Sequence, residues 1–289
     1  MSGDTFPAAV LNPADAPNRA DRMQGIFRWV VLGAMTALIL VPLVPLLVWS
    51  VAFRWVFPSI LPTEWSWRAW SYISSPEAKV FEAFKNSALL ALIVTSVSTL
   101  IGIPAGRALG LYKFRGKRFV QFLILAPAIL PGLAVVMGIQ ILFIRYGLSD
   151  TFLGVALVHL IPITPYMTSV LASVFANYDV EFEEQARVLG AGPVRRFFLI
   201  TLPMIVPGLA IGALFAFLIS WSQYVLTLMI GGGTVVTLPL LVFSFAGSGD
   251  NGIASALSLV FVAPSIIMLI FTSRYLGGGS SGLGGFGKL

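Results

Sequence analysis

The segment between Phe197 and Gly249 contains no charged residue. Across the whole chain of 289 residues, 57% are hydrophobic and only 10% are charged, and the mean hydropathy is +0.92. Soluble domains carry about 25% charged residues. The composition therefore predicts an all-α polytopic membrane protein that lies in the lipid bilayer.

A transmembrane helix needs about 20 consecutive apolar residues. Six segments meet this requirement, and each is predicted to be one span: Phe27–Phe53, Ser87–Ala105, Phe119–Phe143, Thr151–Ala176, Pro203–Ile230 and Ile253–Ser273. The segment Thr234–Ala246 follows three glycines and is too short to cross, so we predict a re-entrant or interfacial piece there.

The positions of Lys and Arg predict the orientation, because these residues are enriched in cytoplasmic loops. With six spans, thirteen of the 18 Lys and Arg residues fall on the side of the two termini and five on the other side. We therefore expect a multi-pass protein of the cell (inner or plasma) membrane with both termini in the cytoplasm. The net charge of +6 comes from bases beside apolar spans, so no nucleic-acid partner is predicted.

This topology divides the chain into consecutive parts. They are a cytoplasmic tail (1–26), a first span (27–53), an outer loop (54–86), a core (81–276) that contains a cytoplasmic loop (178–203), and a Gly-rich tail (277–289). The outer loop carries four tryptophans, which are typical of a membrane interface and are also available to a partner outside.

The loop from Tyr178 to Pro203 is the only long polar stretch in the last two-thirds of the chain. Its acids precede its bases, which is the order that a helix dipole favours. Asp179 can cap a short helix in which Phe182, Ala186 and Leu189 fall on one stripe.

The same loop contains the residues that end one helix and begin another. Gly190 and Gly192 give the backbone freedom to end the first helix, and Pro193 suits the first turn of the next. The second helix is predicted to run to about Ile200, with a new apolar segment beginning at Thr201.

Six residues of this loop fit a spaced pattern, Glu-x-Ala, three residues, Gly, nine residues, Ile-x-Leu-Pro. They are Glu184, Ala186, Gly190, Ile200, Leu202 and Pro203. The pattern resembles the coupling loop, or EAA loop, of permease subunits of type I ABC importers. Gln185 replaces the first Ala of that motif, which is a conservative change on a helix surface.

The resemblance covers roughly Phe81 to Leu276 and implies the six-helix permease fold. It implies that the coupling loop, including Arg187, docks on a cytoplasmic ATPase subunit. Two ATPase subunits, a second permease subunit (homologous or identical) and an extracytoplasmic solute-binding protein would complete the complex. ATP and Mg would bind the ATPase, since this chain has no phosphate-binding G-x-x-x-x-G-K-[ST] motif. We expect it to be a transport subunit that is not an enzyme and holds no cofactor or metal.

Polar residues inside the apolar spans are candidates for the translocation path, because such groups usually face a cavity or another helix. The candidates are Ser220, Ser222, Gln223, Tyr224 and His159. Trp221 is predicted to pack, and a polar contact within the bundle is the favoured role of the lone His159. Contacts between helices remain an alternative for the whole set.

The sequence leaves the substrate open. The amino-acid sequence resembles the polyamine, iron and phosphonate branch of these permeases, with Leu189 where carbohydrate permeases commonly carry Asp. Yet Ser222 and Gln223 are neutral where polyamine permeases tend to carry acids, so a sugar or another small polar solute is the alternative. A stand-alone channel or secondary transporter is disfavoured, because no predicted span contains Asp or Glu and no repeat is evident. A membrane enzyme would need catalytic groups clustered at one depth, and none is found.

Overall fold

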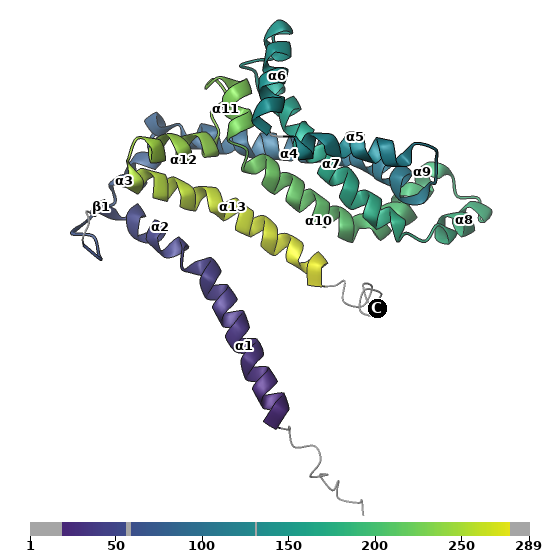
Figure 1. Ribbon diagram of the computed structural model, residues 1–289, viewed down its shortest axis with the longest axis horizontal. Helices are drawn as coiled ribbons and strands as arrows, with labels where there is room; N and C mark the ends of the chain where they lie inside the picture. Colours follow the sequence, from purple (N-terminus) through teal and green to yellow (C-terminus); the bar gives the residue numbers. More distant parts are fainter. Residues whose placement is uncertain (1–18, 56–58, 131, 278–289) are drawn as a thin grey trace, which may run out of the picture. The chain divides into compact units, whose positions relative to one another are not determined.

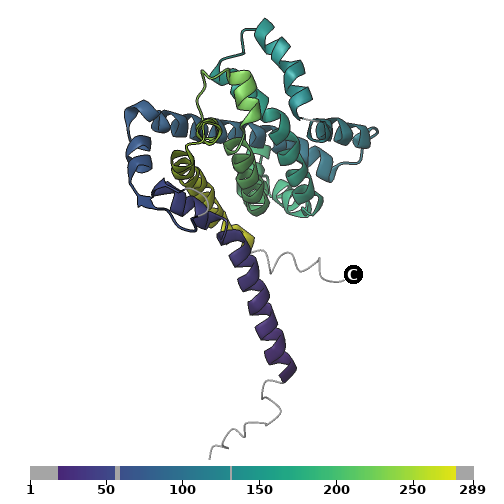
Figure 2. The ribbon, with the colours of Figure 1, turned by 60° about the vertical axis from the view of Figure 1, so that its left-hand side comes forward.

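The computed structural model describes residues 19–55, 59–130 and 132–277. These residues divide into two compact units, Met1–Val48 and Trp49–Leu289, and each is described by itself. The elements are almost all helices (Figures 1 and 2). This confirms the predicted all-α class.

The first unit contains α1 (Arg19–Leu40) and all but the last two residues of α2 (Leu43–Ser50), and these helices meet at a bend of 40°. Pro42 lies at the bend and Pro45 in the first turn of α2, where proline removes backbone donors and interrupts a helix. The described part of α1 begins at Arg19, inside the predicted tail, so the polar residues before the apolar run are also helical.

The second unit contains four helices long and apolar enough to cross a membrane. They are α4 (Val80–Leu111), α7 (Phe152–Ala176), a continuous helix over Pro193–Trp221 that includes α10 (Leu202–Trp221), and α13 (Asn251–Gly277). A further pair, α5 (Lys117–Ile129) and α6 (Gly132–Arg145), meets at a bend of 87°. The described residues thus hold four spans, or up to six if each bent pair is one span.

Glycines at every fourth position of α4 let this helix lie directly against α7. A Cβ atom on Gly102 would lie 2.7 Å from Met167 Cγ, and one on Gly106 would lie 2.6 Å from Leu171 Cβ. Gly110 continues the series, 2.6 Å from Phe175 Cβ. Small residues with this spacing allow two helix backbones to approach closely in a membrane.

The order of these contacts fixes the relative direction of the helices. Residue numbers rise together along α4 and α7, so the two helices are parallel. Residues 112–151, which connect them, must therefore cross the membrane once, and among the described residues of this connection α5 and α6 are the helices that can do so. Along α10 the numbers run the other way, because Gly208 meets Val174 and Gly212 meets Met167.

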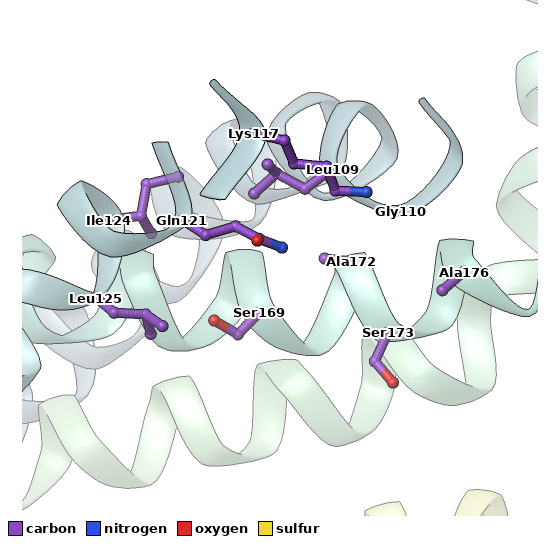
Figure 3. Close-up of a pocket in the computed structure, with 10 residues that line it drawn as sticks. All are labelled: Leu109, Gly110, Lys117, Gln121, Ile124, Leu125, Ser169, Ala172, Ser173 and Ala176. Carbon is purple, nitrogen blue, oxygen red and sulfur yellow. The ribbon is translucent and has the colours of Figure 1, made fainter. Parts of the chain in front are cut away.

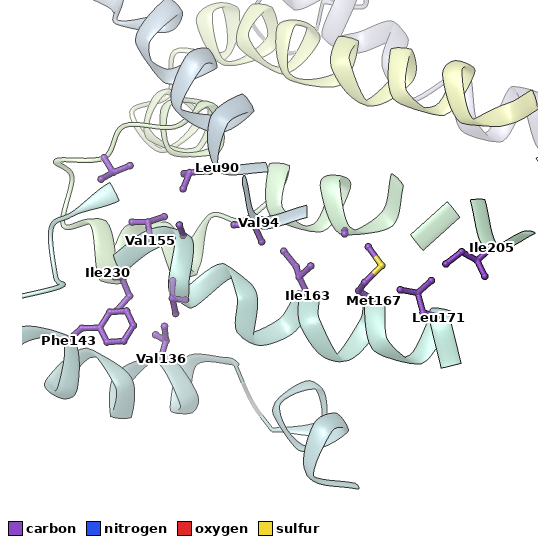
Figure 4. Packing of buried hydrophobic residues seen from close by; sticks show 14 of the residues in the cluster. Leu90, Val94, Val136, Phe143, Val155, Ile163, Met167, Leu171, Ile205 and Ile230 are labelled. Carbon is purple, nitrogen blue, oxygen red and sulfur yellow. The ribbon is translucent and has the colours of Figure 1, made fainter. Parts of the chain in front are cut away.

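The larger hydrophobic core surrounds α7 (Figure 4). Ile163, Met167 and Leu171 are fully buried along one side of this helix. A second cluster centres on Trp221, whose ring stacks on Phe217 and Phe261. The indole N–H of Trp221 donates to the carbonyl of Phe261 over 3.0 Å, which confirms that Trp221 packs.

The predicted outer loop contains short elements at the end of the bundle opposite α8 and α9 (Figure 1). Strands β1 (Ala52–Arg54) and β2 (Glu64–Trp65) pair antiparallel, and α3 (Arg68–Ile73) and η2 (Pro76–Ala78) follow. Arg68 forms a 2.8 Å ion pair with Asp250, which also accepts the N–H of Ile253 at the start of α13. Trp65 and Trp67 are exposed.

Two of the predicted boundaries are wrong. No break separates the loop from the next span at Thr201, because α9 (Pro193–Arg196), a π-helical turn η3 (Phe197–Thr201) and α10 form one helix. The predicted span Pro203–Ile230 instead ends at Trp221, and α11 (Val225–Gly231) is a separate helix. At this break the hydroxyl of Thr227 donates to the carbonyl of Gln223 over 3.0 Å.

The remaining apolar segment forms α12 (Leu238–Gly247), a helix of 10 residues. At about 1.5 Å per residue it is too short to cross a bilayer, as predicted. The Gly-rich tail beyond Gly277 and the N-terminal residues before Arg19 lie outside the described residues.

Candidate functional site

The loop between α7 and α10 begins with α8 (Glu181–Val188). Asp179 Oδ1 accepts the N–H of Glu181 at 2.9 Å, so the predicted cap is made, although the residue in the N-cap position is Val180. Three acids in the first turn complement the helix dipole.

Helix α8 ends in a complete Schellman motif. Gly190 has φ +84°, and its N–H donates to the carbonyl of Arg187 over 3.0 Å. The N–H of Ala191 donates to the carbonyl of Ala186 over 2.9 Å. These two bonds satisfy carbonyls that a helix end leaves unpaired, and the left-handed position favours glycine. Gly190 therefore has the helix-ending role predicted for it, whereas Gly192 has an ordinary φ of −65°.

A buried carboxylate fixes this loop to the end of α4. The Arg107 guanidinium donates to both oxygens of Glu183, each over 2.7 Å. The hydroxyls of Tyr178 and Thr201 donate to Glu183 Oε1 over 2.8 and 2.7 Å. Glu183 is only 7% exposed. One side chain thus joins α4, the residues after α7, α8 and the π-helical turn.

The electrostatics of this cluster favour the ionised carboxylate. The hydrogen bonds from the Arg107 guanidinium lower the pKa of Glu183 from 4.5 to about 2, with further lowering from Thr201 and Tyr178. Burial raises the pKa of the Tyr178 hydroxyl. Tyr178 is therefore a neutral donor at pH 7 and Glu183 a charged acceptor, which is the stronger type of hydrogen bond.

The structure separates the predicted coupling residues from this anchor. Glu184, Arg187, Gly190 and Pro203 are exposed, while Ala186, Ile200 and Leu202 are half-buried. The buried anchor is the neighbouring Glu183, and sequence reasoning missed its partners Arg107, Tyr178 and Thr201. A signal for Arg107 was present, since a charged residue within an apolar helix needs a partner.

The loop also presents an apolar outer surface. Val188 and Leu189 are each 87% exposed, and Val194 in α9 is 69% exposed. Phe182 and Leu189 of the predicted stripe thus point away from the chain's own core. Exposed apolar side chains grouped on a rigid segment are typical of an interaction surface.

The predicted path residues fall into two groups at the break between α10 and α11. His159 is buried in α7, with Nδ1 3.0 Å from Ser220 Oγ and Nε2 3.0 Å from Thr227 Oγ1. This confirms a polar contact inside the bundle for His159.

The other three residues lie in the break itself. Gln223 lines an apolar cavity of about 230 Å³ together with residues of α6 and α7. Ser222 is exposed, and the Tyr224 ring stacks on Phe243 of α12 with centroids 4.2 Å apart.

Comparison with known proteins identifies the family of the chain. Residues 102–276 match the family of binding-protein-dependent transport system inner membrane components. The chain belongs to this family. It is a permease of a binding-protein-dependent importer, and therefore a transport subunit and a multi-pass protein of the inner membrane.

Several relatives of this permease have known names. It is 31% identical to the putrescine transport system permease protein PotI of Escherichia coli K12, covering 71% of this chain and 76% of the relative. It is 26% identical to the spermidine/putrescine permease PotC of Shigella flexneri, covering 75% and 82%. It is 28% identical to the molybdate/tungstate permease WtpB of Pyrococcus furiosus, covering 69% and 80%.

The fold of the permease is similar to that of a solved importer. A crystal structure of a bacterial ABC transporter involved in import of the acidic polysaccharide alginate aligns with a TM-score of 0.69 and 20% identity. The alignment covers 89% of this chain and 98% of the solved chain.

Proposed function

We propose that the loop from Tyr178 to Pro203 docks on a separate ATPase subunit and carries its motion into the membrane. The observation that supports this most directly is the fixed position of α8. Its N-terminal half is held by Glu183 and its end by the Schellman motif, while Val188, Leu189 and Val194 remain exposed. A partner that contacts these apolar residues would move a rigid body.

The proposed complex contains two ATPase subunits, a second permease subunit and an extracytoplasmic solute-binding protein. The coupling loop and both termini would face the cytoplasm, in keeping with the distribution of Lys and Arg. ATP and Mg would bind the ATPase subunits. Because Pro193–Trp221 is one helix, closure of the ATPase dimer would act directly on the break at Ser222 and switch the path between its two faces.

A polyamine-type solute is the substrate class that the named relatives favour. A neutral polar solute such as a sugar is the second candidate, because α7, α10 and α11 carry no carboxylate that would attract a polycation. For the path we propose Gln223 as the contact, since its amide faces a cavity and can both donate and accept. His159 and Ser220, which bond each other, would instead hold the break together.

Co-expression with the candidate ATPase subunit tests the coupling proposal. The two proteins should co-purify, and replacing Val188 and Leu189 with Ser should abolish co-purification without removing the permease from the membrane. An ATPase that remains bound to this variant would overturn the proposal. Uptake of radiolabelled putrescine and of a neutral sugar by cells with and without this chain would separate the two substrate classes.

A further inference from the structure

A cavity that contains none of the proposed path residues or the exposed residues of the coupling loop lies between α4, α5 and α7 (Figure 3). It has a volume of about 510 Å³ and opens beside the C-terminal ends of α4 and α7, the same end as the coupling loop. Leu109, Ile124 and Leu125 supply apolar parts of the lining, and Lys117 and Gln121 from α5 supply polar parts (Figure 3). The lining thus combines mainly apolar side chains with one cation.

A second cavity of about 440 Å³ shares Lys117 and Gln121 with the first. Its lining adds Lys113, Gly116 and Arg118 and contains no carboxylate. None of these cations forms an ion pair within the described part of the chain, although Lys117 Nζ donates to the carbonyl of Tyr112 over 3.2 Å. Three positive charges therefore face this space without a counter-charge.

The backbone adds to the same positive potential. Helix α5 begins at Lys117 with Gly116 as its N-cap, and no side chain caps it. The positive end of the helix dipole thus favours an anion near these cations. Phe119 and Phe122 of α5 are also exposed.

We propose that this site binds an anionic phospholipid, with the phosphate at Lys113, Lys117 and Arg118 and an acyl chain along the groove between α5 and α7. A basic pocket between helices at a membrane surface is the arrangement that recognises anionic headgroups. An acidic protein surface would match the charges but would leave the apolar groove empty. The site is independent of the transported solute and of the ATPase partner.

Native mass spectrometry of the full-length chain in detergent, titrated with phosphatidylglycerol or phosphatidylcholine, tests the proposal. The parent should retain phosphatidylglycerol in preference to phosphatidylcholine. Each of Lys113→Gln and Lys117→Gln should weaken the affinity for phosphatidylglycerol about fivefold, because one base near an anionic headgroup contributes about that factor. Lys117→Arg should restore the parent affinity.

Lys79→Gln and Lys85→Gln are the matched controls, because both side chains are exposed at the opposite end of α4. Ser169 also lines the cavity and points toward α5 (Figure 3). Ser169→Phe, which fills the groove without changing charge, should lower retention of the intact lipid but not of glycerol phosphate. Equal retention of the two lipids by the parent would overturn the proposal. So would full displacement by inorganic phosphate, or lysine variants that lose the ATPase subunit while keeping phosphatidylglycerol.

Discussion

Two adjacent glutamates in α8 occupy opposite environments. Glu183 is buried and accepts four hydrogen bonds, whereas Glu184 faces solvent. The sequence pattern selects Glu184, because a spaced motif records position along the chain and not the direction of a side chain. The direction depends on Arg107, which lies 76 residues away, so it could not be read from the loop alone.

Replacing Glu183 with Ala should destabilise the protein by about 3 kcal/mol, since removing one member of a buried pair leaves the other charge uncompensated. Glu184→Ala is the matched control and should change stability by less than about 0.5 kcal/mol. Thermal unfolding of the purified protein measures both. The exchange Arg107→Glu with Glu183→Arg should recover part of the loss, and equal melting temperatures for the two single variants would contradict the anchor.

The anchor should also make stability depend on pH. Because folding lowers the pKa of Glu183 from 4.5 to about 2, its contribution is fully present above pH 4.5 and is lost as the pH falls through 2. The shift corresponds to about 3 kcal/mol at most. The melting temperature of the parent should fall more steeply than that of Glu183→Gln between pH 4.5 and 2.5. Parallel curves for the two proteins would refute the assignment.

At the scale of elements, the sequence predicts the existence of helices better than their limits. Apolar runs identify the spans, because a helix that crosses lipid must be apolar along its own length and this can be read from its own residues. The break at Ser222 was missed because it depends on His159 in another helix, whose ring bonds the hydroxyls on both sides of it. A hydropathy pattern contains no information about a hydrogen-bond partner in another helix, such as His159.

The end of α8 gives a test at this scale. Gly190→Val should uncouple ATP hydrolysis from uptake, because a β-branched residue is strained at φ +84° although nothing lies within 4 Å of its Cβ position. Gly192→Val is the matched control, since Gly192 has an ordinary φ and similar free space. Stimulation of the ATPase by the binding protein in proteoliposomes measures coupling. An unchanged response in Gly190→Val would contradict a fixed loop.

The seam between α4 and α7 gives a second test. Gly106→Ala should destabilise the protein by about 1–3 kcal/mol, because its Cβ would lie 2.9 Å from the Ala172 backbone nitrogen. Gly138→Ala in α6 has nothing within 4 Å and should be neutral or slightly stabilising, as expected from helix propensity. The melting temperatures of the two variants measure this difference in stability. Equal values would mean that α4 and α7 can move apart at Gly106 without a loss of stability.

For the whole molecule, the parallel contact of α4 with α7 places the loop after α4 and the coupling loop at the same end. The chain has no native cysteine, so single cysteines can report on this directly. An impermeant thiol reagent added outside cells should label a cysteine at Lys79 but not one at Lys113 or Arg195. Labelling at Arg195 from outside would overturn the assigned orientation.

The π-helical turn at Phe197–Thr201 has a consequence for the evolution of this chain. The helix from Pro193 to Trp221 is roughly 43 Å long, at about 1.5 Å per residue, and its continuity fixes the rotation of α9 relative to α10. A π-helical turn contains one residue more than the α-helical turn it replaces, so deleting one residue from Phe197–Thr201 would restore a regular α-helix. Deleting a single residue elsewhere in this helix would instead rotate α9 by about 100° relative to α10. The loop would then present a different side to its partner while the packing within the membrane stayed intact. Insertions and deletions should therefore be tolerated in the connections between spans, and loss of one residue in this turn, long before they are tolerated in the α-helical parts of this helix.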